Sequence, residues 1–227
     1  MNLFQKLFFY TVWPRINLLF SIYRRLLIFN ELPKLFDKEV LLVGTSPQLD
    51  LNLLERHSES FSIGLHRVHK IFHLTSWRPN VLFLGDEALL IQQGKEIISS
   101  QNINTVIVLG CGFWIPCGDW KNKFIYLKLR QKSIDDFIST DNYRLQNAKS
   151  YIVGDSVLCL AMQYCIKERV KRIVITGVNF NYEQGYMEKS INNIGINQPK
   201  PTEAKNQYLY FRRVCSDLGI EVVHDFK

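Results

Sequence analysis

Short apolar runs separated by small and polar residues dominate the chain after residue 38. Val40 to Val43 are four consecutive apolar residues between a charged pair and the turn Gly44-Thr45-Ser46-Pro47, which is typical of a strand covered on both faces. Similar runs predict further strands at residues 60–65, 80–86, 103–109, 124–127, 172–178 and 220–223.

Segments with helical spacing of apolar residues alternate with these strands. The pattern at residues 156–167 predicts the clearest helix, residues 202–217 predict another, and a short helix is expected after Asp50. Strands that alternate with helices predict an α/β domain with a doubly wound, mostly parallel, Rossmann-like sheet. We place this single domain at residues 34–227, after an N-terminal segment at residues 1–33.

The N-terminal residues 1–30 are rich in apolar and aromatic side chains. Basic residues and Pro14 interrupt them, so they lack the uncharged run of about 18 residues that a membrane-spanning helix needs. No small-residue cleavage site follows, which argues against a cleaved signal. We expect an amphipathic helical extension on a membrane surface, with a helical hairpin packed on the domain or on a partner chain as the alternative. The expected location is cytoplasmic, peripheral to the inner membrane.

Composition narrows the class of protein further. With 227 residues and 47% hydrophobic content, the chain can bury a core. Its net charge of +7 is spread along the sequence, without the clustered basic patch of a nucleic-acid-binding domain. The five cysteines form no C-x-x-C pair, so neither a disulfide framework nor a zinc site is indicated, and the histidine spacing predicts no metal site.

The residues just after the strands are the candidates for function, because a ligand of such a sheet lies across the carboxyl ends of its strands. They are Gly44, Thr45, Ser46, Pro47, His66, Arg67, Asp86, residues 110–112, Gly154, Asp155, Ser156, Asn179, Tyr182, Tyr186 and His224. Hydroxyl, amide and imidazole groups outnumber carboxylates in this set, which favours a phosphate-bearing ligand. The helix start at Ser156 is a candidate anion site, with simple N-capping as the alternative.

The order of four motifs resembles a known family. The motifs are residues 43–49, residues 63–67, the helix start at residues 154–156, and residues 173–180 followed by tyrosines. This order resembles the bacterial sialyltransferases of glycosyltransferase family 42 over residues 38–226. It is equally similar to the related DUF115 family, which includes archaeal hydroxymethylpterin pyrophosphokinases and flagellin-modifying motility accessory factors. The resemblance implies a GT-A-like variant of the fold and a nucleotide-sugar donor, with no further cofactor required.

The same resemblance implies roles for individual residues. Gly44, Thr45, Ser46 and Pro47 would contact the donor nucleotide, Gly154, Asp155 and Ser156 would hold the donor, and Tyr182 and Tyr186 would stabilise the departing phosphate. Asp86 and Asn179 are further donor-binding candidates because they follow predicted strands. The chain has Thr45 and His66 where the family has asparagines, and Val153 near the place of an arginine. The family's catalytic base is a histidine that residues 183–212 lack. His66, Asp155, Glu183 and His224 remain candidates for that base.

Three functions follow from these patterns. The first is metal-independent transfer from a cytidine-linked sugar, such as cytidine-monophosphate sialic acid, to a glycan or lipid-linked acceptor of surface polysaccharide. The second is phosphoryl or pyrophosphoryl transfer to a pterin-like molecule. The third is a catalytically silent nucleotide-binding scaffold. The expected partners are a donor, an acceptor and a membrane surface, without nucleic acid, and a homo-oligomer is left open.

Overall fold

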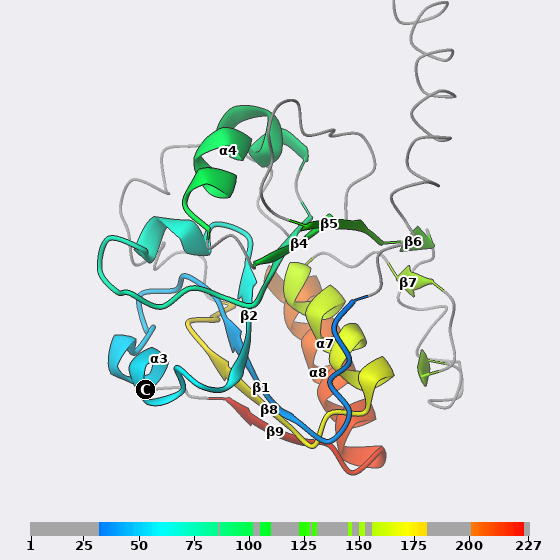
Figure 1. Ribbon diagram of the computed structural model, residues 1–227. Coiled ribbons are helices and arrows are strands. Elements are labelled where there is room, and N and C mark those ends of the chain that lie inside the picture. Colours follow the sequence, from blue (N-terminus) through cyan, green and yellow to red (C-terminus); the bar gives the residue numbers. More distant parts are fainter. Residues whose placement is uncertain are drawn as a thin grey trace, which may run out of the picture.

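The protein has a seven-stranded parallel sheet with helices on both of its faces. A computed structural model describes residues 32–85, 87–101, 105–109, 123–127, 129–130, 145–146, 150–152, 156–180 and 201–224. The strand order is β5-β4-β3-β2-β1-β8-β9, and every neighbouring pair is parallel (Figure 1). The predicted α/β class with a Rossmann-like sheet is confirmed.

The strands and helices have the following bounds. The large sheet contains β1 (Glu39–Val43), β2 (Phe61–Leu65), β3 (Val81–Leu84), β4 (Val106–Leu109), β5 (Lys123–Tyr126), β8 (Arg172–Thr176) and β9 (Glu221–His224), and a small sheet pairs β6 (Leu129–Arg130) with β7 (Tyr151–Ile152). The helices are α3 (Leu51–Arg56), α4 (Glu87–Ser99), α7 (Val157–Glu168) and α8 (Pro201–Asp217), with a 3-10 helix η2 (Val68–Ile71). Each strand of the large sheet was predicted, whereas α4, η2 and the small sheet were not.

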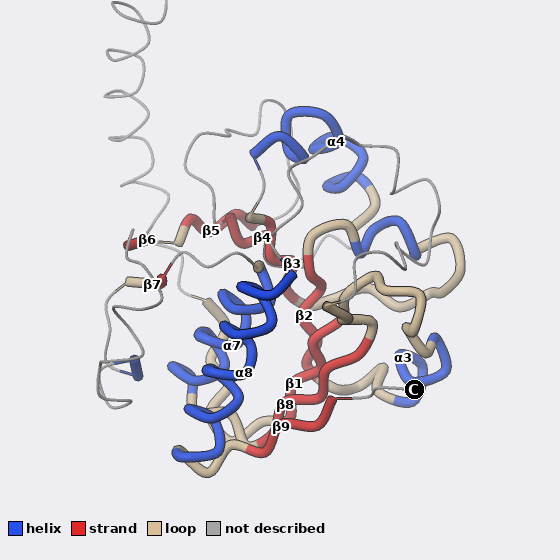
Figure 2. Tube along the Cα trace, turned by 180° about the vertical axis from the view of Figure 1, so that it is seen from behind, coloured by secondary structure: helices blue, strands red, loops and turns tan. Residues whose placement is uncertain are grey.

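Alternating side chains of the strands enter two separate cores. Val40 and Leu42 of β1 point to the face that α7 and α8 cover, while Leu41 and Val43 point to the face covered by α3, η2 and α4. Figure 2 shows the two groups of helices on opposite sides of the sheet. Both faces are therefore dry, which explains why the strands lack the alternation of polar and apolar residues that a half-exposed sheet would show.

Helix α7 is the most deeply buried helix among the described residues. Ten consecutive residues, from Val157 to Ile166, are buried, because the helix packs on β1, β2 and β3 and also contacts α8 and β7. It begins at Ser156, whose hydroxyl oxygen accepts a hydrogen bond from the Leu158 N–H at 3.2 Å. Arg169 ends it in a left-handed conformation, with φ of 53°. Cys159 and Cys165 lie in this helix as buried small hydrophobic side chains, as predicted.

The chain reaches β1 through residues 32–38, which we call the leading segment. The Tyr164 hydroxyl donates to the Pro33 carbonyl, and the Leu35 N–H donates to Glu168 at 3.4 Å. Leu35 itself is fully buried. These contacts fix the leading segment along the C-terminal half of α7. The predicted helical extension before it lies outside the described residues, and none of the described helices is long and apolar enough to cross a membrane.

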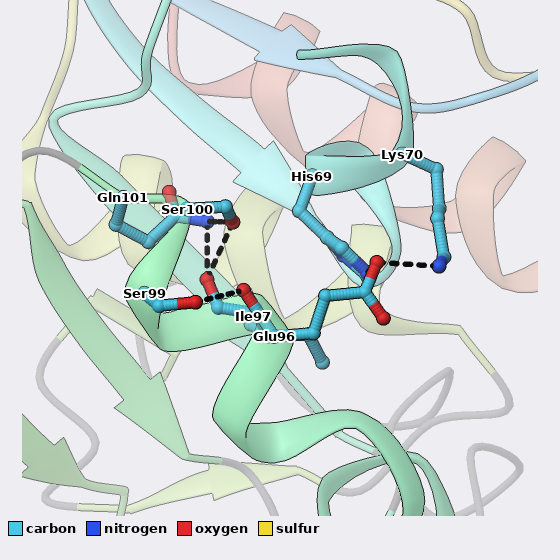
Figure 3. Close-up of polar contacts among 7 residues, drawn as sticks. All are labelled: His69, Lys70, Glu96, Ile97, Ser99, Ser100 and Gln101. Atoms are coloured by element: carbon cyan, nitrogen blue, oxygen red, sulfur yellow. Dashed lines mark hydrogen bonds and ion pairs between the residues drawn. The ribbon is translucent and has the colours of Figure 1, made fainter. Parts of the chain in front are cut away.

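A buried histidine lies where η2 packs against α4. The side chain of His69 is 1% exposed, and its Nε2 lies 3.8 Å from a carboxylate oxygen of Glu96 (Figure 3). The same oxygen accepts an ion pair from Lys70 Nζ at 2.6 Å, so Glu96 is already balanced by a nearer cation. Burial is the main cause that lowers the pKa of His69 to about 4; the Glu96 carboxylate opposes this shift, and the positive charges of Lys70 and Arg67 add to it.

We predict that His69 makes the fold sensitive to acid. An unfolded histidine titrates near 6.5, whereas the folded protein keeps His69 neutral down to about pH 4. The unfolded chain therefore binds the extra proton, and the free energy of unfolding should fall by up to about 3 kcal/mol as the pH drops through this window. His69→Gln should flatten that slope in urea titrations at several pH values. His73→Gln, which changes an exposed histidine nearby, is the control; an unchanged slope in His69→Gln would contradict the prediction.

Candidate functional site

The carboxyl ends of the strands meet where the direction of winding changes. Strand β1 lies between β2 and β8, and the chain adds β2 to β5 on one side and β8 and β9 on the other. The helices that follow β1 and β8 lie on opposite faces of the sheet, so the loops after these two strands diverge. A crevice outside such a pair of strands is the usual place for a ligand in this architecture.

Two glycines bring the ends of β1 and β8 into backbone contact. A Cβ atom on Gly44 would lie 2.3 Å from the Gly177 carbonyl oxygen, and one on Gly177 would lie 2.7 Å from the Gly44 oxygen. Gly177 also has φ of +62°, in the left-handed region. Only residues without a Cβ permit this approach, and we call this pair the glycine contact.

The predicted nucleotide turn, Gly44 to Pro47, begins at this glycine contact. Its N–H groups bond within the domain: Gly44 to the Thr176 carbonyl (2.9 Å), Ser46 to the Gly177 carbonyl (2.7 Å), Gln48 to the Ser46 hydroxyl (3.3 Å) and Leu49 to the Ser46 carbonyl (3.0 Å). Pro47 has no N–H group to give. The Thr45 N–H is thus the backbone donor of this turn that no other described residue occupies. Thr45 and Ser46 are nevertheless 7% and 8% exposed, so a ligand would meet only their edges.

His66 stands at the end of β2 in a conformation that is rare for a residue with a side chain. Its φ is +49°, and its N–H donates to the Phe83 carbonyl at 2.9 Å. Its Nε2 is buried and lies 3.6 Å from where a Cβ on Gly85 would be. A left-handed conformation at a non-glycine residue costs about 1–2 kcal/mol and recurs at functional sites. His66 is therefore held in place by the neighbouring strand.

The start of α7 lies against the same glycine. A Cβ on Gly85 would lie 2.6 Å from Cγ2 of Val157, the first residue of α7. Gly85 thus allows the helix start to lie close to the ends of β2 and β3, beside the His66 imidazole. Three segments that are far apart in the sequence meet here, and the positive end of the helix dipole faces the carboxyl edge of the sheet.

The register of the strands joins the two parts of this site. Val43 of β1 pairs with Gly64 of β2, so Gly44 lies next to the last residues of β2, one strand away from His66. The Gly44 turn and His66 thus follow neighbouring strands, and the start of α7 lies beside His66 at Gly85. Ser156 also acts as the N-cap of α7, which was the alternative interpretation of that residue.

His224, at the end of β9, is held by both of its ring nitrogens. Its Nε2 donates to the Val178 carbonyl at 3.0 Å, because a carbonyl can only accept. Its Nδ1 therefore accepts from the Tyr208 hydroxyl, also at 3.0 Å. Burial raises the pKa of Tyr208, which keeps this donor protonated. The Tyr208 ring also contacts Phe180, so His224 and α8 together fix the loop that follows β8.

The remaining predicted site residues divide into two groups. Asn179 is half-buried in the loop between Val178 and Phe180, at the same edge of the sheet. Asp86, Gly154, Asp155, Tyr182 and Tyr186 lie outside the described residues. Within the described residues, no three His, Cys, Asp or Glu side chains gather as the ligands of a metal would.

Three residues of the site escaped the sequence analysis. Gly85 and Gly177 directly follow β3 and β8, as Gly44 follows β1, and this recurrence of glycine at strand ends was the available signal. Tyr208 lies within the apolar pattern of α8, and nothing local distinguishes it from a core tyrosine.

Comparison with profiles of known protein families gives no match for this chain, and comparison with curated protein sequences gives none either. The residues at the carboxyl edge of the sheet are therefore the basis for proposing a function.

We predict that Gly44→Ala disturbs the contact between Gly44 and Gly177. The new methyl group would collide with the Gly177 carbonyl and force β1 and β8 apart, at a cost of about 2–3 kcal/mol in the free energy of unfolding. Gly219→Ala is the matched control: Gly219 has φ of +73° but no atom within 4 Å of an added Cβ. That change should cost only about 1 kcal/mol in urea denaturation. Equal losses in the two variants would show that contact between the loops is unimportant.

Proposed function

We propose that the protein is a glycosyltransferase-like enzyme that transfers a sugar from a nucleotide donor to a glycan or lipid-linked acceptor during surface polysaccharide synthesis. In this proposal the sheet is a GT-A-like variant, and the donor lies across the ends of β1, β2 and β3. The observation that carries the proposal is the position of His66, held in a left-handed conformation beside Gly85 and the start of α7.

The donor's phosphate would lie at the start of α7. Helix N-termini bind phosphates through free N–H groups and the positive end of the dipole. The Ser156 hydroxyl occupies the N–H of Leu158 and the Ser156 carbonyl that of Cys159, at 3.0 Å, so the first turn would offer a phosphate the Val157 N–H and the helix dipole. These groups suit one or two phosphates of a nucleotide sugar.

The nucleoside would lie over the Gly44 turn. The backbone of this turn is already bonded to the β8 loop, so it offers a rigid surface and the edge of Thr45 rather than a ring of N–H donors. Such a surface supports a ribose or base more readily than a phosphate. The proposed roles thus differ from those in a phosphate-binding loop: the turn would contact the nucleoside, and the start of α7 would bind the phosphate.

His66 is the better candidate for the base than His224. A general base needs a nitrogen directed at the acceptor hydroxyl. Both nitrogens of His224 are engaged by Val178 and Tyr208, so that ring serves to position the β8 loop. His66 lies beside the proposed phosphate position, and because its Nε2 is buried, the other ring nitrogen, Nδ1, would take the acceptor proton. Tyr182 and Tyr186, which follow Phe180 in the sequence, would then stabilise the departing nucleotide without a metal.

A silent nucleotide-binding scaffold is the second candidate function. It is favoured by one observation, that the donors of the Gly44 turn are largely engaged within the domain, by the carbonyls of Thr176 and Gly177 and by Ser46 of the turn itself. A site with few free donors can hold a nucleotide without activating it. Both candidate functions include nucleotide binding, but only the transferase would turn the donor over.

We predict that cytidine nucleotides stabilise the protein without magnesium. A nucleoside mono-, di- and triphosphate series is added at about 100 times the Kd, where bound ligand contributes about 2.7 kcal/mol and should raise Tm by roughly 5 °C or more. Stabilisation only by ATP with Mg²⁺ would favour phosphoryl transfer instead. No response to any nucleotide would contradict both the transferase and the nucleotide-binding scaffold.

We predict that His66→Asn separates catalysis from folding. Asparagine tolerates the left-handed conformation better than most residues, so Tm should stay the same or rise. Loss of the imidazole should lower donor turnover about 100-fold or more, while the nucleotide-induced shift in Tm is kept. His73→Asn, at an exposed histidine away from the site, should change neither. Unchanged turnover in His66→Asn would remove this residue from the mechanism, and absent turnover in the unmodified protein would favour the scaffold.

A further inference from the structure

An exposed aromatic side chain stands in the leading segment, at the edge of the sheet opposite to the candidate site. Phe36 is 72% exposed, although its neighbour Leu35 is fully buried. The Asp37 N–H donates to the Arg169 carbonyl at 3.1 Å, and the Lys171 N–H donates to the Lys38 carbonyl at 2.9 Å. Phe36 is therefore held outward by a segment fixed to the domain, rather than exposed on a loose end.

Basic residues lie near Phe36 along the leading segment and on the chain that is hydrogen-bonded to it. We call residues 32–38 and 169–171 the basic corner, since they contain four basic residues, Lys34, Lys38, Arg169 and Lys171, and one acid, Asp37. All five of these side chains are exposed. The adjacent glutamates Glu39 and Glu221 share an ion pair with Arg172, at 3.0 Å and 3.3 Å, so their charges are partly balanced locally. The corner thus combines positive charge with a protruding apolar group.

The corner is also the place where the rest of the chain joins the domain. Residues 1–31 connect directly to Leu32 at the start of the leading segment, and they contain many aromatic, aliphatic and basic residues. A positively charged surface with an exposed aromatic group, continuous with such a sequence, complements a layer of anionic lipid headgroups.

We propose that the basic corner is a docking surface for anionic lipid, with Phe36 entering the headgroup layer and the four basic side chains contacting lipid phosphates. The inference rests on the proposed function for its choice of a membrane as the partner. It assigns the orientation of the folded domain, because the corner adjoins the C-terminal end of α7 whereas the candidate site adjoins its N-terminal end. The twelve residues of α7 separate the two ends by about 18 Å. The carboxyl edge thus faces away from the lipid, open to a soluble nucleotide donor.

Binding of the full chain to vesicles tests this orientation. Cosedimentation is measured with vesicles of phosphatidylcholine alone and of phosphatidylcholine mixed with phosphatidylglycerol. The double variant Lys38→Gln, Lys171→Gln should weaken binding to the anionic vesicles about 25-fold, since each basic residue near such a surface contributes about fivefold. Phe36→Ser should weaken binding about tenfold. All three positions are exposed, so neither variant should impair folding.

Matched variants on α8 provide the controls. Arg212→Gln with Arg213→Gln removes the same charge from exposed positions of α8, and Leu209→Ser removes an exposed apolar side chain of that helix. These variants should change vesicle binding less than about threefold, because α8 does not carry the corner. Equal losses in the corner and α8 variants, or unaltered binding in the corner variants, would overturn the proposal. So would failure of the unmodified chain to bind anionic vesicles.

The nucleotide response keeps this test separate from the proposed function. The corner variants should keep the Tm shift that cytidine nucleotides cause in the unmodified protein. If the unmodified protein binds vesicles through the corner but ignores nucleotides, the proposed function fails and the docking surface stands. If it responds to nucleotides but the corner variants bind vesicles normally, the docking surface fails alone.

Discussion

The contact between Gly44 and Gly177 is the constraint on which the carboxyl edge of the sheet depends. Strands β1 and β8 pair along their whole length, and the two glycines extend that pairing by one backbone contact beyond the last paired residues. Because the loops touch at this point, the turn after β1 takes its shape from the loop after β8 rather than from its own sequence. The same loop is held from its other side by His224 and Tyr208, so β1, β8, β9 and α8 together define one wall of the candidate site.

The opposite wall depends on a different close approach. Gly85 lets the first residue of α7 lie against the end of β3, and His66 lies beside this junction with a backbone conformation that the Phe83 carbonyl helps to hold. The two walls use their histidines differently. His224 has both nitrogens engaged in support of a loop, whereas His66 combines backbone strain with a position at a helix start. Strain that neighbouring strands maintain is more readily explained by function than by stability, because a left-handed histidine contributes nothing to the core.

Features that depend on residues close together in the sequence could be predicted, whereas features that depend on contacts between distant residues could not. The seven strands of the large sheet were predictable because a strand buried on both faces leaves a continuous apolar run, and α7 was predictable because Ser156 caps it within the sequence. Helix α4 was missed: Gly94 interrupts it, and its apolar pattern is short beside its polar residues. The two-residue strands β6 and β7 carry no periodicity at all. At the site, the Gly44 turn and His66 were found from their place after strands, but the engagement of His224 by Val178 and Tyr208 depends on contacts across 46 and 16 residues. No local pattern encodes such contacts.

Helix α7 links the two ends of the molecule. Its start forms part of the candidate site, and its end is bonded to the leading segment through Tyr164 and Glu168. Ten buried residues lie between, packed against the sheet and α8, so the helix cannot shift at one end without disturbing the core. Whatever holds the leading segment therefore also fixes the direction in which the helix start points. A rigid helix that is bonded to the leading segment at one terminus and borders the candidate site at the other therefore fixes the direction of the carboxyl edge relative to the leading segment.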